Sequence, residues 1–491
     1  MVVTYFFLGV YVMAMVFVLF YSMAQAHLLV HFFRFKKWSK SPESLDTNDL
    51  PLVTVQLPVY NEKYVVARLI EAVAKLRYPG EKLEIQLLDD STDETGDLIR
   101  ENIAKFPEVN FRYIHREERK GFKAGALKEG LAQASGELIA IFDADFVPDP
   151  DFLLRTVGHF RDEKTGMVQT RWTHLNETYS VLTRLQAFAL DAHFMVEQMG
   201  RNQQQAFINF NGTGGIWRKT CILDAGNWQD DTLTEDLDLS YRAQQRGWKF
   251  VYRPDIHSPA ELPPVMSAIK SQQFRWTKGG AECASKHLLD VWRKPLPLRV
   301  KFHATAHLLN AVIFIAVLTV SLSSIPVWWA FYQGWIPDSY FQLAAVFLLG
   351  FVVIALVYFV ANLSLLRYSW RGVGRFIWEL PLFLSVSMGL ALHNAQAVWE
   401  GLTGKKSPFI RTPKYNLSQE KSGWQSNIYH SVHIPATTYV EAVFAVVFSA
   451  IVGFSIYTQT YEMLLFHAML AVGYSLVSIT SFRSYHLKST F

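Results

Sequence analysis

Two aspartates, Asp143 and Asp145, flank a single alanine at the end of an apolar run over 137–142. Two carboxylates this close together repel each other unless a cation or protons neutralise them. Mg²⁺ and Mn²⁺ bind one or two carboxylates together with phosphate oxygens. The pair therefore predicts a site for a divalent cation and a phosphate-bearing ligand. The alternative is that Asp145 or Asp149 only caps the following helix.

Two other acidic positions precede this pair along the chain. Asp89 and Asp90 end an apolar run over 83–88, and Glu62 follows an apolar run over 53–57. A carboxylate at such a position can accept hydrogen bonds from a nucleobase N–H group and a ribose hydroxyl. Helix capping is the alternative for the aspartates.

Lys123 lies in a glycine-rich stretch that opens a predicted helix over 124–134. The free N–H groups and the dipole of a helix N-terminus attract phosphate, and a lysine there adds positive charge. The stretch therefore predicts contact with a diphosphate, unless the lysine only projects from a turn into solvent.

Thr234, Glu235 and Asp236 open another predicted helix, for which Thr234 is a candidate N-cap. Asp236 is a candidate general base, which takes the proton from an acceptor hydroxyl as that hydroxyl attacks an anomeric carbon. Such a single displacement needs no covalent intermediate and inverts the anomeric configuration.

Four residues, Gln272, Gln273, Arg275 and Trp276, stand just ahead of a long apolar region. Arginine stabilises negative charge on a departing diphosphate, and tryptophan offers a flat face to a sugar ring. The alternative is an interfacial tryptophan and arginine pair that anchors a helix at a membrane surface.

The elements that must position these residues alternate between short apolar strands and helices. Strands are predicted over 53–57, 83–88, 111–114 and 137–142, with helices over 62–76 and 124–134 among them. This alternation is typical of a parallel α/β sheet of the Rossmann-like kind. Ligands bind such sheets beyond the carboxyl ends of the strands, where the acidic residues fall.

The composition indicates a soluble domain inserted between membrane segments. Of the 491 residues 50% are hydrophobic and only 18% are charged, against about 25% charged in soluble domains. The apolar excess lies in the first 33 residues and again after about residue 303. A net charge of +4 without a run of lysine or arginine argues against nucleic acid as a partner.

The division into parts follows from these apolar segments. Residues 1–33 are predicted to be a membrane anchor, 50–300 a cytoplasmic domain, and 301–491 a region of membrane and interfacial helices. Basic residues follow the first segment and favour the cytoplasm for the next one. If 376–398 lies along the inner face, every basic cluster becomes cytoplasmic, which predicts five spans plus one interfacial helix rather than six spans.

The order of these motifs resembles glycosyltransferase family 2 polysaccharide synthases with the GT-A fold, over residues 53–276. The stretches Gln56–Glu62, Leu87–Asp93, Gly121–Gly130, Ile141–Phe146 and Phe210–Arg218 are similar to those of cellulose-synthase-like mannan and glucan synthases. The resemblance implies donor-binding residues: Glu62, Asp89, Asp90, Lys123, Asp143, Asp145, Gln272, Gln273 and Arg275. It implies an acceptor site made by Phe210, Asn211, Gly212, Thr213 and Trp276.

The resemblance also implies that Asp236 is the base, within the motif that contains Thr234 and Glu235. Phe409, Thr412 and Lys414 resemble a gating loop of cellulose synthases that closes over bound donor, within a loop over 405–430. Arg411 stands where that pattern has valine.

Together these features predict an inverting hexosyltransferase that polymerises hexose from GDP-mannose or UDP-glucose into a β-linked mannan or glucan. A β-1,4 linkage and export of the polymer are expected, with Mg²⁺ or Mn²⁺ as cofactor. The expected partners are the nucleotide-sugar donor, the growing polysaccharide, the lipid bilayer, and accessory proteins for export or modification.

A multi-pass location follows, in a bacterial inner membrane, a plasma membrane or the Golgi, with the catalytic domain in the cytoplasm. One alternative is a non-processive enzyme that makes a glycolipid on a ceramide or polyprenyl-phosphate acceptor. A transporter or receptor with a non-catalytic soluble domain is the other.

Overall fold

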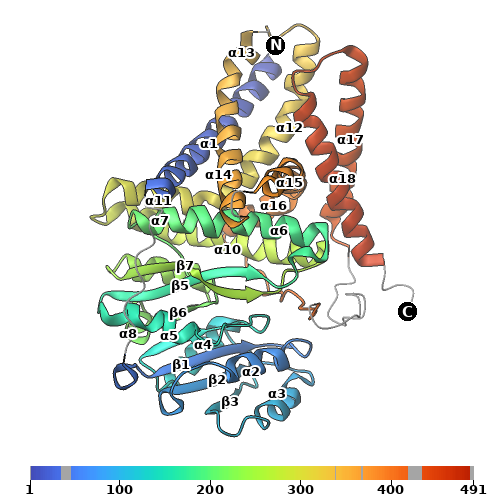
Figure 1. Ribbon diagram of the computed structural model, residues 1–491. Coiled ribbons are helices and arrows are strands. Elements are labelled where there is room, and N and C mark those ends of the chain that lie inside the picture. The colour runs from blue at the N-terminus through green and yellow to red at the C-terminus, as the bar shows by residue number, and fades with distance from the viewer. Residues whose placement is uncertain (1, 35–45, 338, 367–368, 418–433, 487–491) are drawn as a thin grey trace.

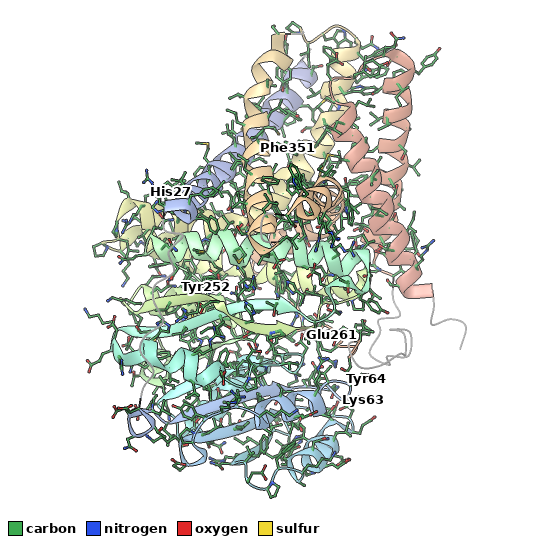
Figure 2. All side chains as sticks on the ribbon, in the orientation of Figure 1. His27, Lys63, Tyr64, Tyr252, Glu261 and Phe351 are labelled. Carbon is green, nitrogen blue, oxygen red and sulfur yellow. The ribbon has the colours of Figure 1, made fainter. Side chains whose placement is uncertain are left out.

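The computed structural model describes residues 2–34, 46–337, 339–366, 369–417 and 434–486 (Figure 1). A region built on one β-sheet lies at one end of the molecule, and long helices rise from it at the other end. Figure 2 labels Lys63, Tyr64 and Tyr252 in the sheet region and Phe351 among the long helices.

Seven strands form the sheet in the order β3-β2-β1-β4-β6-β5-β7. They are β1 (Val53–Val59), β2 (Leu83–Asp89), β3 (Phe111–His115), β4 (Leu138–Ile141), β5 (Thr165–His174), β6 (Gly215–Arg218) and β7 (Lys249–Ala260). The first four are mutually parallel, and the register pairs Val59 with Asp89. Their carboxyl ends therefore meet at one edge, as the sequence predicts.

The four predicted strands are parallel as expected, and β6, which is not predicted from the sequence, runs antiparallel to both β4 and β5. Gly215 pairs with Ile141, so the turn before β6 lies directly beside the end of β4. Gly212 and Gly214 adopt φ values of +80° and +65° in this turn, which glycine permits without steric cost. The reversal brings the turn at 211–214 next to Asp143.

Helices cover both faces of the sheet. In the sheet region they are α2 (Val66–Ala74), α3 (Thr95–Ile103), α4 (Phe122–Gln133), α5 (Phe152–Thr156), α8 (Lys219–Asp224) and α9 (Glu235–Gln244). Leu69 and Val73 of α2 pack with Val55 of β1 in one core. Leu127 of α4 packs with Ile141 of β4 in a second core on the other face.

The helix predicted from residue 62 begins later, at Val66. Asn61 adopts a positive φ of 54°, and its side-chain oxygen accepts the N–H of Thr92 at 2.8 Å instead of capping the helix. Its own N–H donates to Ser91 Oγ at 2.8 Å. These bonds hold residues 60–63 as a turn at the sheet edge.

A layer of helices lies between the sheet and the long helices (Figure 1). It contains α6 (Val181–Ala192), a π-helix over His193–Gln198, α7 (Met199–Gln203), α10 (Met266–Arg293) and α16 (Ala391–Leu402). Ser180 caps α6 through a capping box with Thr183. The helix α10 is 28 residues long, lies within this layer and contains Arg275 and Trp276.

Among the described residues five helices are long and apolar enough to cross a membrane. They are Thr4–Arg34 in α1 (Val2–Arg34), Leu298–Tyr332 over α11 (Leu298–Leu308) and α12 (Ile313–Tyr332), Ala345–Leu365 including α14 (Leu348–Leu365), α17 (Ala436–Thr458), and Leu464–Ser484 in α18 (Leu464–His486). The segment expected at 376–398 is a broken pair, α15 (Trp370–Gly389) and α16, bent by 51°. Counting the bent pair as one span would give six.

Candidate active site

A cleft opens at the carboxyl ends of β1, β2 and β4, with a volume of about 1270 Å³ that includes space open to solvent. The residues predicted for the site that line it come from eight separate stretches of the chain: Glu62, Asp90, Lys123, Asp143, Asp145, Asn211, Gly212, Thr234, Glu235, Asp236, Gln272, Arg275, Trp276, Phe409, Thr412 and Lys414.

Four residues predicted for the site are not among the described residues that line the cleft: Asp89, Phe210, Thr213 and Gln273. Asp89 is fully buried; it accepts the N–H of Ser91 at 2.9 Å and the hydroxyl of Tyr113 at 2.7 Å. Its carboxylate therefore joins the loop after β2 to β3.

Thr213 and Phe210 lie behind the wall of the cleft and hold the turn before β6 in place. Thr213 Oγ1 accepts the N–H of Asp143 at 2.9 Å and so holds the turn before β6 against the end of β4. Phe210 is fully buried, and its ring packs edge-on against Trp217 at 5.5 Å between centroids. The structure therefore gives both residues a role in positioning the turn that carries Asn211 and Gly212.

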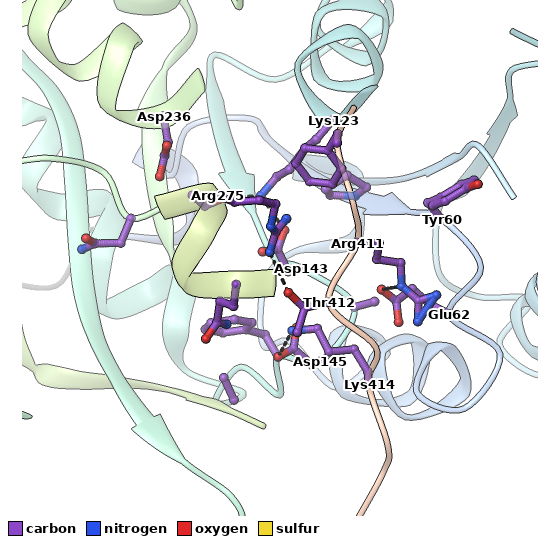
Figure 3. A pocket seen from close by; sticks show the side chains of 18 of the residues that line it. Tyr60, Glu62, Lys123, Asp143, Asp145, Asp236, Arg275, Arg411, Thr412 and Lys414 are labelled. Carbon is purple, nitrogen blue, oxygen red and sulfur yellow. Dashed lines mark hydrogen bonds and ion pairs between the residues drawn. The ribbon is translucent and has the colours of Figure 1, made fainter. Parts of the chain in front are cut away.

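Each of the paired aspartates contacts a lysine from a distant part of the chain (Figure 3). Lys123 Nζ lies 2.6 Å from Asp143 Oδ1 and also donates to the carbonyl of Gly212 at 2.8 Å. Lys414 Nζ lies 2.7 Å from Asp145 Oδ2. The helix-capping alternative for Asp145 is wrong, because the N-cap position of α5 is Asp151.

The aspartates are suited to a divalent cation. Asp145 is 2% exposed, and its Oδ1 is buried without a hydrogen-bond partner. The described residues contain no group of three histidine, cysteine or acidic side chains placed to hold a metal alone. Asp143 and Asp145 could supply two ligands, which leaves positions for phosphate oxygens, the set that Mg²⁺ and Mn²⁺ favour.

Asp236 lies in the first turn of α9, which begins directly after Thr234. A Cβ atom at Gly212 would stand 3.2 Å from Asp236 Oδ2, so the glycine leaves the carboxylate open to the cleft. Enclosure by the protein and the adjacent charge of Glu235 raise the pKa of Asp236 to about 7. A carboxylate with this pKa is suited to general-base catalysis near neutral pH.

Thr234 and Asp238 have structural roles around this base. Thr234 occupies the N-cap position but makes no side-chain capping bond, and its Oγ1 lies 3.5 Å from Cys283 Sγ. Asp238 is buried and binds His287 at 2.8 Å and Arg242 at 2.6 Å. Asp236 is therefore the aspartate of this helix that faces the cleft.

The helix α10 directs Arg275 and Trp276 into the cleft from the membrane side. Arg275 donates to Thr412 Oγ1 at 2.9 Å, and its guanidinium stands 4.6 Å from the centre of the Phe409 ring. A positive charge at this place can stabilise a leaving diphosphate.

The segment that resembles a gating loop crosses the mouth of the cleft (Figure 3). Phe409 stacks on Phe122 at 5.6 Å between ring centroids. Arg411, which departs from the family pattern, pairs with Glu62, with 3.1 Å between Nε and Oε1. Burial raises the pKa of Glu62 to about 7, although Arg411 and Lys414 oppose the shift. Residues 418–430 of the predicted loop lie outside the described residues.

Several residues of the cleft were not predicted from the sequence: Tyr60, Arg119, Trp172, His174 and Glu261. The guanidinium of Arg119 lies 3.5 Å from the centre of the Tyr60 ring. Tyr60 lies within the stretch Gln56–Glu62 that resembles the family, so its place in that stretch could have indicated it. Glu261 follows β7 in a stretch with no motif of its own.

Comparison with known proteins agrees with this architecture. Residues 51–279 match the family model described as glycosyltransferase like family 2. The chain is 44% identical over 279 residues to the probable glucomannan 4-beta-mannosyltransferase 7 of Oryza sativa subsp. japonica, covering 55% of this chain and 48% of that one. It is 38% identical over 323 residues to glucomannan 4-beta-mannosyltransferase 7 of Arabidopsis thaliana, covering 61% and 58%.

The chain spans about half the length of the curated relatives it matches. Among solved structures it is similar to the mannosyltransferase PcManGT from Pyrobaculum calidifontis in complex with GDP-Man and Mn²⁺, with a TM-score of 0.53 and 19% identity. That match covers 81% of this chain and 100% of the other. The resemblance predicted from the motifs is thus confirmed: the chain carries a glycosyltransferase family 2 domain with the GT-A fold.

Proposed function

We propose that this protein is an inverting membrane glycosyltransferase that polymerises mannose from a nucleotide-sugar donor into a β-1,4-linked mannan. The observation that supports this proposal most directly is the convergence of Asp143, Asp145, Asp236 and Arg275 on one cleft. The two named relatives, which are 44% and 38% identical to this chain over the matched residues, favour mannose over glucose as the transferred sugar.

In the proposed reaction the acceptor hydroxyl oxygen bonds to the anomeric carbon while the bond from that carbon to the diphosphate oxygen breaks. Asp236 takes the hydroxyl proton, and the configuration inverts because there is one displacement. Lys123 and Arg275 stabilise the charge on the departing diphosphate. A divalent cation held by Asp143 and Asp145 would neutralise more of that charge. Trp276 offers its ring to the acceptor sugar.

We further propose that the sheet region faces the cytoplasm. Arg34 ends α1, at the helix end that lies toward the sheet region in Figure 1, and Arg375 near the start of α15 pairs with Glu177, which follows β5. Basic residues at the ends of membrane helices favour the cytoplasmic side.

The test is a donor screen on the purified protein in lipid nanodiscs with Mn²⁺, using GDP-mannose and UDP-glucose. The expected product is a polymer from GDP-mannose that an endo-β-1,4-mannanase degrades, and Asp236→Asn should produce none. A single sugar transferred to lipid, with every donor, would refute polymer synthesis and favour a glycolipid product.

A further inference from the structure

Residues 405–417 cross the mouth of the cleft as a strap without helix or strand. Phe409, Arg411, Thr412 and Lys414 point from the strap into the cleft. A segment without regular structure has a large conformational entropy, so contacts with the rest of the protein must hold it in one place. The strap has such contacts at both ends.

At the C-terminal end of the strap, the carboxylate of Glu261 binds the strap backbone and forms the first half of what we call the clasp (Glu261 is labelled in Figure 2). Its Oε2 accepts the N–H of Asn416 at 3.0 Å, and its Oε1 accepts the N–H groups of Tyr415 and Leu417, both at 3.3 Å. Asn416 adopts a positive φ of 55°. This backbone turns three successive N–H groups toward one point, a concavity that binds anions.

Arg68 of α2 completes the clasp. Its Nη2 lies 3.2 Å from Glu261 Oε2, and its Nη1 donates to Asn416 Oδ1 at 2.8 Å. The same guanidinium reaches the carbonyl of Asp145 at 3.4 Å. The side chains of Arg68 and Glu261 are 7% and 2% exposed. Arg68 therefore joins the strap, β7 and the turn of the paired aspartates.

The other end of the strap is tied to α10 and α16. Lys278 is fully buried, and its Nζ lies 3.3 Å from Glu400 Oε2. It also donates to the carbonyl of Lys405 and to Ser407 Oγ. With both ends held, Glu261 fixes the three residues directly after Lys414 and so helps to keep Lys414 on Asp145.

We propose that Glu261 and Arg68 are positioning residues, which form a clasp that holds the strap over the cleft and thereby supports donor binding. The inference rests on the proposed function in taking a nucleotide sugar as the ligand beneath the strap. Neither residue is a catalytic residue, because Glu261 and Arg68 pair with each other and bind the strap instead of the reacting atoms.

Limited digestion with trypsin in nanodiscs tests the clasp without requiring activity. In Glu261→Ala, cleavage after Arg411 and Lys414 should accelerate about tenfold or more, as expected when charge-assisted hydrogen bonds that oppose local opening are lost. The matched control is Glu84→Ala, because Glu84 is also buried and accepts hydrogen bonds from Thr54, Ser135 and Gln86. Cleavage of the strap in this control should match wild type.

Unchanged strap cleavage in Glu261→Ala, or equal acceleration in Glu84→Ala, would overturn the proposal. If Glu261→Ala cannot be purified, Arg68→Gln serves as the second variant. Arg68→Gln leaves the carboxylate of Glu261 in place, and cleavage of the strap should still accelerate in it. In the transferase assay the clasp variants should raise the donor KM about tenfold with kcat nearly unchanged, whereas a general loss of structure would lower kcat. If the wild-type protein transferred no sugar but cleavage of the strap still accelerated in Glu261→Ala, the proposed function would be refuted and the clasp would be supported.

Discussion

Lys414 Nζ lies 2.7 Å from Asp145 Oδ2, although the two residues are 269 positions apart in the chain. Lys123 makes the equivalent contact with Asp143, at 2.6 Å. The protein therefore balances both carboxylates of the proposed cation site with its own lysines. One of these lysines belongs to the strap, so the charge of the site and the position of the strap are linked.

Replacing Lys414 should make the stability of the protein depend on divalent cations. In Lys414→Gln the buried Asp145 loses its counter-charge, and we expect a cost of about 1–3 kcal/mol in the absence of metal. Mn²⁺ should raise the melting temperature of this variant more than that of wild type. The matched control is Lys406→Gln, since Lys406 is exposed and bonds only the carbonyl of Asp231 among the described contacts. An equal Mn²⁺ effect in all three proteins would contradict the prediction.

Replacing the proposed base should remove transfer while leaving donor binding intact. Asp236→Asn cannot take a proton, and kcat should fall by about 10²–10⁴-fold with little change in donor KM. The measurement is transfer from GDP-mannose together with donor binding by calorimetry. Retained turnover in a folded Asp236→Asn protein would exclude Asp236 as the base.

The rate should depend on pH through Asp236. The raised pKa of about 7 means that this carboxylate is protonated, and unable to act as a base, at lower pH. We therefore expect kcat/KM, which reports the pKa values of the free enzyme, to rise with pH through about 7. Glu235→Gln removes the adjacent negative charge that raises this pKa, so the rise should move to lower pH. A profile that stays in place in Glu235→Gln would assign the titration to another group.

Gly212 should not tolerate a side chain. Its φ of +80° disfavours other residues, and a Cβ would stand 3.2 Å from Asp236 Oδ2. Gly212→Ala should cost about 1 kcal/mol or more in stability and lower kcat, because the methyl group shields the base. The matched control is Gly80→Ala, where a Cβ meets no atom within 4 Å and φ is not positive. Equal activity of the two variants would show that the close approach has no effect.

Much of the fold could be predicted because it depends on local patterns. Short apolar runs alternating with helices predict parallel strands, and the carboxyl ends of parallel strands meet at one edge. Asp90 and Asp143 therefore reach the same cleft for reasons that can be read from the sequence. The antiparallel β6 could not be predicted in this way, because a strand of four residues carries no signal of its direction.

The roles of individual acids were harder to predict than their location. Asp89 and Asp90 are neighbours in the sequence, yet Asp89 is buried against Tyr113 and Asp90 lines the cleft. Successive residues of an extended chain point to opposite sides, so one of an adjacent pair turns away. Which one turns depends on the registers of β1, β2 and β3.

The sequence by itself determined the order of the motifs, the apolar lengths that can cross a membrane, and the edge of the sheet at which the acids gather. These depend on residue type and on spacing within a few turns or strands. Only the tertiary structure decided that Lys414 neutralises Asp145, that Arg411 pairs with Glu62, and that Glu261 binds the backbone of the strap. Such contacts join segments 154 to 349 residues apart, and the path of a strap without regular structure follows from the surfaces that bind it.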